Sequence, residues 1–169
     1  MKHGRIIAIA LLFASGALCS FSARAQAASY PYSIHGTVVG VTDGDTIKVL
    51  RGKELFKIRL NGIDAPESKQ AYGKKSKECL SSLVFGKDVE VIVREMDRYG
   101  RYVGDVMVGG KSANAVLVAE GLAWHYTQYS KDASLAALEK EARAKRLGLW
   151  ADRSPVPPWD FRHKKTKKG

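Results

Sequence analysis

The stretch IHGTVVGVTDGDTIKVLRGKELFKIRLNGI, residues 34–63, decides the fold of this chain. It contains three segments that are rich in Val and Thr or that alternate apolar with polar side chains, at residues 34–41, 46–50 and 55–63. Both patterns are typical of β-strands. Asp43-Gly44 and Arg51-Gly52-Lys53 separate the segments and have the composition of hairpin turns. The stretch therefore predicts a three-stranded meander.

The rest of the chain adds two strand patterns and three helical patterns. Val89, Val91 and Val93 alternate with polar or charged neighbours, and a further strand is expected over residues 101–108. Helices are expected at about residues 70–84, 113–123 and 134–147, with a glycine near the end of each. Five short strands with a helix after the third predict a mainly β fold with α-helices (α+β). The expected architecture is an OB-fold, a five-stranded Greek-key barrel with three helices.

The composition of the 169 residues agrees with a single globular domain, since 45% are hydrophobic and 27% are charged. The net charge of +11 is unusually high. Such an excess indicates a polyanionic partner or an anionic surface, and it carries no information about the fold.

The first 25 residues have the pattern of a secretory signal peptide. Lys2 and Arg5 precede an apolar segment from Ile6 to Leu18, which is shorter than the roughly 20 residues of a spanning helix. Cleavage is expected near Ala25 or Ala27, leaving no stable membrane anchor and a secreted or periplasmic protein. Loss of three basic residues with the signal peptide lowers the net charge from +11 to +8.

Two alternatives for this leader are an uncleaved membrane anchor and a lipoprotein modified at Cys19. Leu18 argues against the second, because a small residue is expected before a lipidated cysteine. Cleavage leaves Cys79 as the single cysteine, which excludes an internal disulfide and disfavours structural zinc. We expect Cys79 to be a small buried side chain.

The predicted order along the chain is a signal peptide, a lead-in, the barrel domain and a basic tail, at residues 1–25, 26–33, 34–151 and 152–169. The tail contains three prolines followed by five lysines and arginines, so we expect it to fray. Its charge is either an ordinary solvated run or a source of nonspecific attraction to phosphates.

Three short segments of the domain combine carboxylates with arginines at turns and strand edges. They are Asp43-Gly44-Asp45-Thr46, Arg59 with Asp64-Ala65-Pro66-Glu67, and Asp97-Arg98-Tyr99-Gly100-Arg101. Carboxylates suit a hard cation such as Ca²⁺ or Mg²⁺, and the planar guanidinium of arginine matches phosphate oxygens. Together the segments predict metal-assisted hydrolysis of a phosphodiester.

Within these segments the residue types suggest separate roles. Asp45 and Asp64 are suitable Ca²⁺ ligands, each at a strand edge where a barrel can hold it rigidly. Glu67 follows a proline-restricted turn, at a spacing that suits a general base facing the same cation. Arg59 and Arg101 supply positive charge for the phosphoryl group.

Over about residues 34–150 the chain resembles the staphylococcal nuclease (thermonuclease) family. The three segments carry the resemblance, together with the helix that contains Asn114 and with Gly148-Leu149-Trp150. It implies an OB barrel with three helices. It also implies a Ca²⁺-dependent phosphodiesterase that cuts DNA and RNA at the 5′ P–O bond and leaves 3′-phosphates.

The resemblance also implies roles for individual residues. The implied Ca²⁺ ligands are Asp45, Asp64 and the backbone carbonyl of Ala65. The implied catalytic residues are Glu67 as general base, with Arg59 and Arg101 on the scissile phosphate and Arg101 also favouring the leaving group. The implied contacts to a neighbouring phosphate are Arg98 and Tyr99.

The chain departs from the family pattern in a few places. Ala65 stands where the type member has Thr, and Arg98 stands where it has Lys. The segment after Glu67 is shorter, and the aromatic run from Trp124 to Tyr129 aligns ambiguously, so no single stacking aromatic is assigned. Trp150 and Trp159 are expected to be packing residues.

Each segment by itself has an ordinary structural explanation, as a hairpin turn, a helix start or a surface hairpin with a salt bridge. Their joint order and strand context favour an enzyme. The rivals are a non-catalytic nucleic-acid-binding OB module and a basic envelope protein that binds polyanions. Neither rival requires Glu67. For the nuclease interpretation we expect a monomer.

Overall fold

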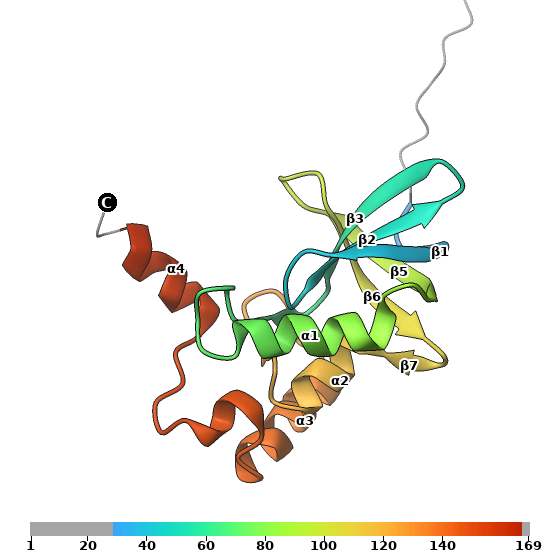
Figure 1. Ribbon diagram of the computed structural model, residues 1–169. Coiled ribbons are helices and arrows are strands. Elements are labelled where there is room, and N and C mark those ends of the chain that lie inside the picture. The colour runs from blue at the N-terminus through green and yellow to red at the C-terminus, as the bar shows by residue number, and fades with distance from the viewer. Residues whose placement is uncertain (1–28, 167–169) are drawn as a thin grey trace, which may run out of the picture.

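The predicted meander is present and forms one side of a closed β-barrel (Figure 1). β1 (Tyr32–Val41), β2 (Thr46–Arg51) and β3 (Glu54–Leu60) pair antiparallel in chain order. The computed structural model describes residues 29–166. The predicted signal peptide, its cleavage sites and the last three residues of the tail therefore lie outside the described residues.

The barrel closes because β3 also pairs with the last long strand. β5 (Asp88–Met96) lies antiparallel between β1 and β6 (Tyr102–Val108). β6 then runs parallel to β3, with Ile58 opposite Tyr102. The predicted five-stranded barrel is thus confirmed, and its closure leaves none of the five strands as a long open edge.

The alternation in the sequence corresponds to the inside and outside of this barrel. Val89, Val91 and Val93 of β5 are buried, as are the residues of β2 and β3 that face them in the same core. Those residues are Ile47, Val49, Ile58 and Leu60. Because successive side chains of a strand point to opposite faces, the polar residues between them lie on the outer surface.

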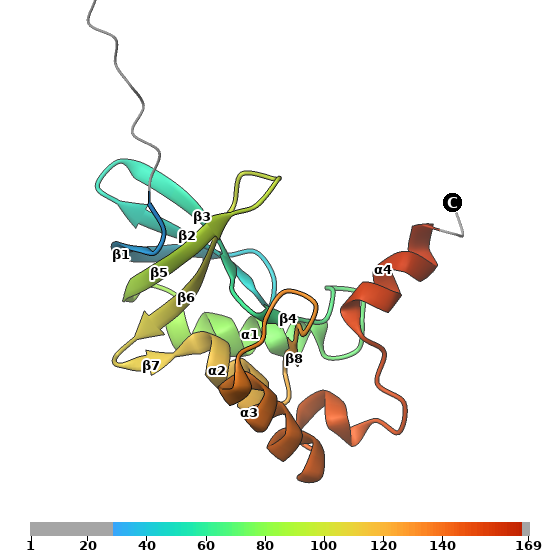
Figure 2. The same ribbon diagram turned by 180° about the vertical axis from the view of Figure 1, so that it is seen from behind.

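Helices gather at one end of the barrel, as Figure 2 shows from behind. The three predicted helices are α1 (Gly73–Val84), α2 (Ala113–Ala119) and α3 (Ala133–Ala144). Each is shorter than predicted. Tyr72 has a left-handed φ of 65°, which an α-helix cannot include, so α1 begins after it.

The other helix ends have similar local causes. α2 begins where the Ser112 hydroxyl accepts from the N–H of Ala115 and ends before Gly121, which has a φ of 64°. α3 begins where Asp132 accepts from the N–H of Ser134 and ends two residues before Arg146, whose φ is 54°.

Short elements complete the described chain. The predicted third strand ends at Leu60 rather than at residue 63, because Gly62 turns the chain with a φ of 70°. The short elements are β4 (Ile63–Asp64) paired with β8 (Trp124–His125), β7 (Lys111–Ser112), and the 3₁₀-helix η1 (Gly148–Ala151). Among the described residues no helix is long and apolar enough to cross a membrane.

A fourth helix corrects the expectation of a fraying tail. α4 (Pro158–Thr166) follows the proline-containing segment, and its first turn is closed by the N–H of Phe161 and the carbonyl of Pro157 at 3.0 Å. Proline is compatible with the first helical position because no hydrogen-bond donor is needed there. Trp159 packs against a second apolar cluster that contains Trp124 and Trp150, which confirms the packing role expected for Trp150 and Trp159.

Asn114 on α2 connects the two strands that close the barrel. Its side-chain oxygen accepts from the N–H of Val106 at 3.0 Å, and its Nδ2 donates to the carbonyl of Asn61 at 2.8 Å. Asn61 follows β3 and Val106 lies in β6. A buried amide therefore holds together the chain segments next to the closure.

We predict that Asn114→Ala lowers the free energy of unfolding by about 2–4 kcal/mol, since each buried polar group left without a partner costs about 1–3 kcal/mol. Urea unfolding of the purified protein measures the change. Lys111→Ala, an exposed change close by in the chain, should alter it by no more than about 0.5 kcal/mol. Equal effects of the two substitutions would contradict the bridging role of Asn114.

Candidate active site

The pairing of β2 with β3 brings the first predicted carboxylate beside the first predicted arginine. Thr46 lies opposite Arg59 in the register, and the N–H of Leu60 donates to the carbonyl of Asp45 at 2.8 Å. Nη1 of Arg59 is then 2.9 Å from Oδ2 of Asp45. The barrel register therefore sets this ion pair.

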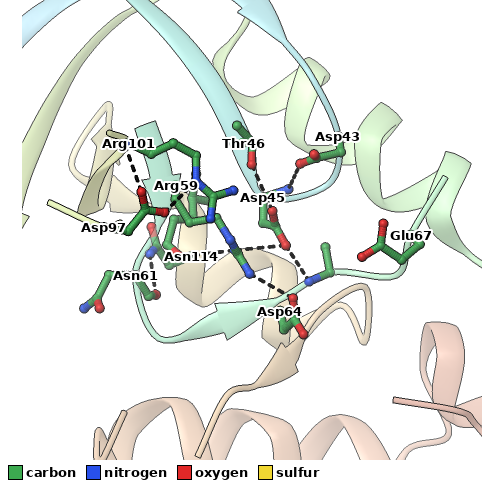
Figure 3. Close-up of polar contacts among 12 residues, drawn as sticks. Asp43, Asp45, Thr46, Arg59, Asn61, Asp64, Glu67, Asp97, Arg101 and Asn114 are labelled. Atoms are coloured by element: carbon green, nitrogen blue, oxygen red, sulfur yellow. Dashed lines mark hydrogen bonds and ion pairs between the residues drawn. The ribbon is translucent and has the colours of Figure 1, made fainter. Parts of the chain in front are cut away.

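Arg59 also reaches the second predicted carboxylate. Its Nη2 is 2.8 Å from Oδ1 of Asp64, and the side chain of Asp64 is only 1% exposed. Asp64 is held in β4 opposite Trp124 of β8. One guanidinium thus spans two buried carboxylates, as the dashed lines of Figure 3 show.

Asp45 is held by its neighbours as well as by Arg59. Oδ2 accepts from the N–H of Ala65 at 2.7 Å, and Oδ1 accepts from the Thr46 hydroxyl at 3.2 Å. Burial raises the pKa of Asp45 to about 7, although Arg59 opposes this shift. The orientation of the carboxylate is therefore fixed from several sides, in a setting that disfavours its negative charge.

Glu67 lies in the loop between β4 and α1, with its side chain 40% exposed. Its N–H donates to Oε1 of Gln70 at 3.1 Å. The first residue of α1, Gly73, packs directly against the backbone of Glu67. A side chain at this position would not fit, because its Cβ would lie 2.8 Å from the carbonyl carbon of Glu67. In Figure 3 Glu67 and Arg101 lie on opposite sides of Asp45.

Arg101 is placed by the barrel closure and by Asp97. It precedes Tyr102, which pairs with Ile58, the residue before Arg59. Nε of Arg101 donates to Oδ2 of Asp97 at 2.6 Å, and its backbone N–H donates to Oδ1 at 2.9 Å. Among the described residues Arg101 forms no ion pair with Asp45, Asp64 or Glu67, the predicted site carboxylates.

At the tip of the β5–β6 hairpin, Arg98 and Tyr99 contact each other. Nη2 of Arg98 is 2.8 Å from the hydroxyl of Tyr99, and its guanidinium carbon is 4.9 Å from the centre of the ring. The side chain of Tyr99 is largely exposed. Their predicted contact with a neighbouring phosphate stays a prediction.

Arg162, which the sequence predicts to lie in the basic tail, also reaches the site. Its guanidinium forms ion pairs with Asp64 and with Glu67, each at 2.8 Å. Two signals in the sequence point to a helix here, since Pro158 suits a first helical position and Asp160 suits a first turn. Nothing in the sequence indicates where such a helix would pack.

The donor set fits a hard cation. Within the described part of the chain, no group of three or more His, Cys, Asp or Glu side chains is arranged to hold a metal by itself. Two buried carboxylates, Asp45 and Asp64, nevertheless share one guanidinium, and the carbonyl of Ala65 follows directly in the chain. Ca²⁺ accepts carboxylates, backbone carbonyls and waters together, so the remaining ligands could be water and substrate.

Comparison with known proteins yields consistent matches. Residues 57–152 match a family described as staphylococcal nuclease homologue. A protein of Escherichia coli named uncharacterized endonuclease is 50% identical over 133 residues, which cover 78% of this chain and 87% of that protein. The micrococcal nuclease of Shigella flexneri is 45% identical over 138 residues, covering 75% of this chain and 79% of that protein. A staphylococcal-like nuclease of Arabidopsis thaliana is 52% identical over 114 residues, covering 68% of this chain and 35% of that protein.

Asp97 provides a prediction about stability and pH. Burial by itself would raise the pKa of Asp97. The pKa is nevertheless held below its ordinary value, because the carboxylate accepts hydrogen bonds from the N–H groups of Tyr99 and Arg101 and from the Arg101 side chain. A lowered folded-state pKa stabilises the fold above the unfolded-state value, and this stabilisation is lost as the pH falls through the folded-state value.

We therefore predict that Asp97→Ala lowers the free energy of unfolding by about 1–2 kcal/mol at pH 7, with a smaller difference from wild type in acid. Urea unfolding at several pH values measures both. Glu54→Ala breaks the exposed Arg51–Glu54 pair of another hairpin and should cost less than about 1 kcal/mol. A difference that stays constant down to pH 2 would rule out the role of the ionised Asp97.

Proposed function

Since this chain belongs to the staphylococcal nuclease family and is a nuclease, we propose that it is an exported, Ca²⁺-dependent phosphodiesterase that acts on DNA and RNA. The observation that carries the proposal is the single guanidinium of Arg59 between two buried carboxylates, Asp45 and Asp64. A module that only binds nucleic acid gains nothing from carboxylates in a phosphate-binding site, because they repel the phosphates.

In the proposed site the carboxylates bind the cation and the arginines bind the phosphate of the substrate. Asp45, Asp64 and the carbonyl of Ala65 would hold Ca²⁺, which when bound supplies positive charge to the phosphoryl oxygens. Arg59, which lies between the two carboxylates, would contact the same phosphate. Arg101 is rigidly oriented by Asp97, which is the requirement for a donor that stabilises charge in a transition state.

Glu67 is the proposed general base. Its carboxylate would accept a proton from a water molecule, whose oxygen forms a new bond to phosphorus. The bond between phosphorus and the 5′ oxygen breaks, and that oxygen leaves as a 5′-hydroxyl after taking up a proton. The other product keeps a 3′-phosphate. Arg101 would stabilise the negative charge that develops on the phosphoryl group and on the leaving oxygen.

The surroundings of the site suit a nucleic acid strand. Arg98 and Tyr99 at the exposed hairpin tip are proposed to contact a neighbouring phosphate of the substrate. The positive net charge of the chain would attract polyanions at long range, with an affinity that falls as salt rises. We propose that the protein acts as a monomer.

We predict that the mature protein cuts single-stranded DNA and RNA with Ca²⁺ and stops when a chelator is added. Glu67→Ala should lower kcat by about 10²–10⁴-fold, and Arg101→Ala by about a hundredfold or more. Labelled oligonucleotides measure the rates and reveal whether the products carry 3′-phosphates. Both variants should still bind the substrate.

The Arg51–Glu54 pair supplies matched controls, since it lies on an exposed hairpin. Arg51→Ala and Glu54→Ala should change the rate by no more than a few-fold. Cleavage that survives the chelator, or that persists at the wild-type rate in Glu67→Ala, would refute the mechanism. Binding without cleavage under all conditions would favour the nucleic-acid-binding module instead.

Export makes a separate prediction. Expressed in a bacterial host, the protein should be recovered outside the cytoplasm, and its N-terminal sequence should begin at Gln26 or Ala28. Replacing the apolar residues Leu11 and Leu12 with Lys should retain the full-length chain inside the cell, because it disrupts the apolar segment. An intact Met1 on the exported protein would support the membrane-anchor alternative.

A further inference from the structure

The C-terminal helix α4 places an arginine on two carboxylates of the proposed active site. Nη1 of Arg162 is 2.8 Å from Oε1 of Glu67, and Nη2 is 2.8 Å from Oδ2 of Asp64. Nη1 also donates to Oδ1 of Asp64 at 3.3 Å. The guanidinium therefore contacts both oxygens of the proposed cation ligand and one oxygen of the proposed general base.

We propose that residues 152–166 form a C-terminal strap that opposes cation binding, with Arg162 held by Asp64 and Glu67 until Ca²⁺ displaces it. This inference rests on the proposed function, because it concerns the cation of that site. It adds a regulatory role for a helix outside the barrel and makes the nuclease self-inhibited when Ca²⁺ is scarce.

The oxygens of Asp64 are already occupied in this arrangement. Oδ1 accepts from Arg59 at 2.8 Å, and Oδ2 accepts from Arg162 at the same distance. A cation that takes Asp64 as a ligand would lie next to two guanidinium groups, and the repulsion between like charges favours the departure of one of them. The side chain of Arg162 is 43% exposed on a terminal helix, whereas that of Arg59 is 14% exposed on a barrel strand. Arg162 is consequently the group that can leave.

The charge balance of the site also favours either Arg162 or the cation, but not both together. Two guanidinium groups, Arg59 and Arg162, face three carboxylates, which are Asp45, Asp64 and Glu67. A divalent cation with Arg59 alone would balance the three carboxylates. Keeping Arg162 as well would add a like charge next to the cation beside Asp64, whose side chain is only 1% exposed, and this repulsion is unfavourable. Departure of Arg162 frees Glu67 for water at the same time.

The strap contacts the domain through Trp159 and the backbone of Val156 as well as through Arg162. The Trp159 ring stacks on Tyr126 with centroids 5.2 Å apart and meets Trp124 edge-on at 5.5 Å. Nε2 of Gln70 donates to the carbonyl of Val156. Figures 1 and 2 show α4 beside the loop that precedes α1 and directed away from the barrel. Trp159 packs against the second apolar cluster and is not part of the barrel core, so the strap can detach while the barrel keeps its core.

A pocket of about 210 Å³ lies where the strap meets the domain. Its lining includes Pro66 and Tyr72 from the domain and Phe161 from α4. The strap and the domain are therefore not in continuous contact at this point.

Calorimetric titration of Ca²⁺ into the mature chain, without substrate, tests the strap. If only the molecules with an open strap bind Ca²⁺, the apparent affinity equals the intrinsic affinity multiplied by the open fraction. We expect Arg162→Ala to bind Ca²⁺ about tenfold more tightly than wild type. Trp159→Ala, which loosens α4 and leaves every carboxylate in place, should also bind more tightly. Arg153→Ala removes an exposed arginine from the same segment and should bind as wild type does.

Each outcome has a distinct meaning. If wild type binds Ca²⁺ and cuts nucleic acid but Arg162→Ala binds no more tightly, the strap is refuted and the proposed function stands. If wild type and all three variants fail to bind Ca²⁺, the proposed cofactor is wrong and the strap is refuted with it. If Arg153→Ala binds Ca²⁺ as tightly as Arg162→Ala does, the gain in affinity comes from the loss of one positive charge anywhere in the segment. That result would also refute the strap.

Discussion

The parallel pairing of β3 with β6 is the contact on which the site depends. It places Ile58 opposite Tyr102, so that Arg59 and Arg101 reach the same end of the barrel although they are far apart in the sequence. The antiparallel pairing of β3 with β2 then sets Asp45 against Arg59. Asn114 bonds to the backbone of β6 and to that of Asn61 just after β3, so a single buried amide on α2 supports the geometry that the arginines require.

Burying carboxylates at this junction creates a demand for positive charge. Removing a charge from water is costly unless a partner compensates it, and burial raises the pKa of Asp45 to about 7 even with Arg59 beside it. A cation satisfies the demand in the proposed active state, and Arg162 contributes to satisfying it in the state described here. The buried carboxylates thus explain both the proposed affinity for a cation and the contact with Arg162, because each supplies the positive charge that they require.

The strands were the most predictable part of the fold because their pattern is local. Val89, Val91 and Val93 are buried in one face of β5, as their alternation predicts. Helix ends were less predictable, since a left-handed residue such as Tyr72 has no mark in the sequence. α4 was missed because its place depends on distant partners: Trp159 stacks on Tyr126, and Arg162 pairs with Asp64. An isolated nine-residue helix is marginal in water, so such contacts decide whether it forms.

By itself the sequence determined the barrel strands, the three main helices and the identity of the charged residues, because apolar periodicity and residue chemistry are properties of short segments. Only the tertiary structure decided which charges meet. It joined Asp45 and Asp64 through Arg59, and it brought Arg162 to the same site. These contacts join chain segments that come together only through strand register and helix packing, so no local pattern could have specified them.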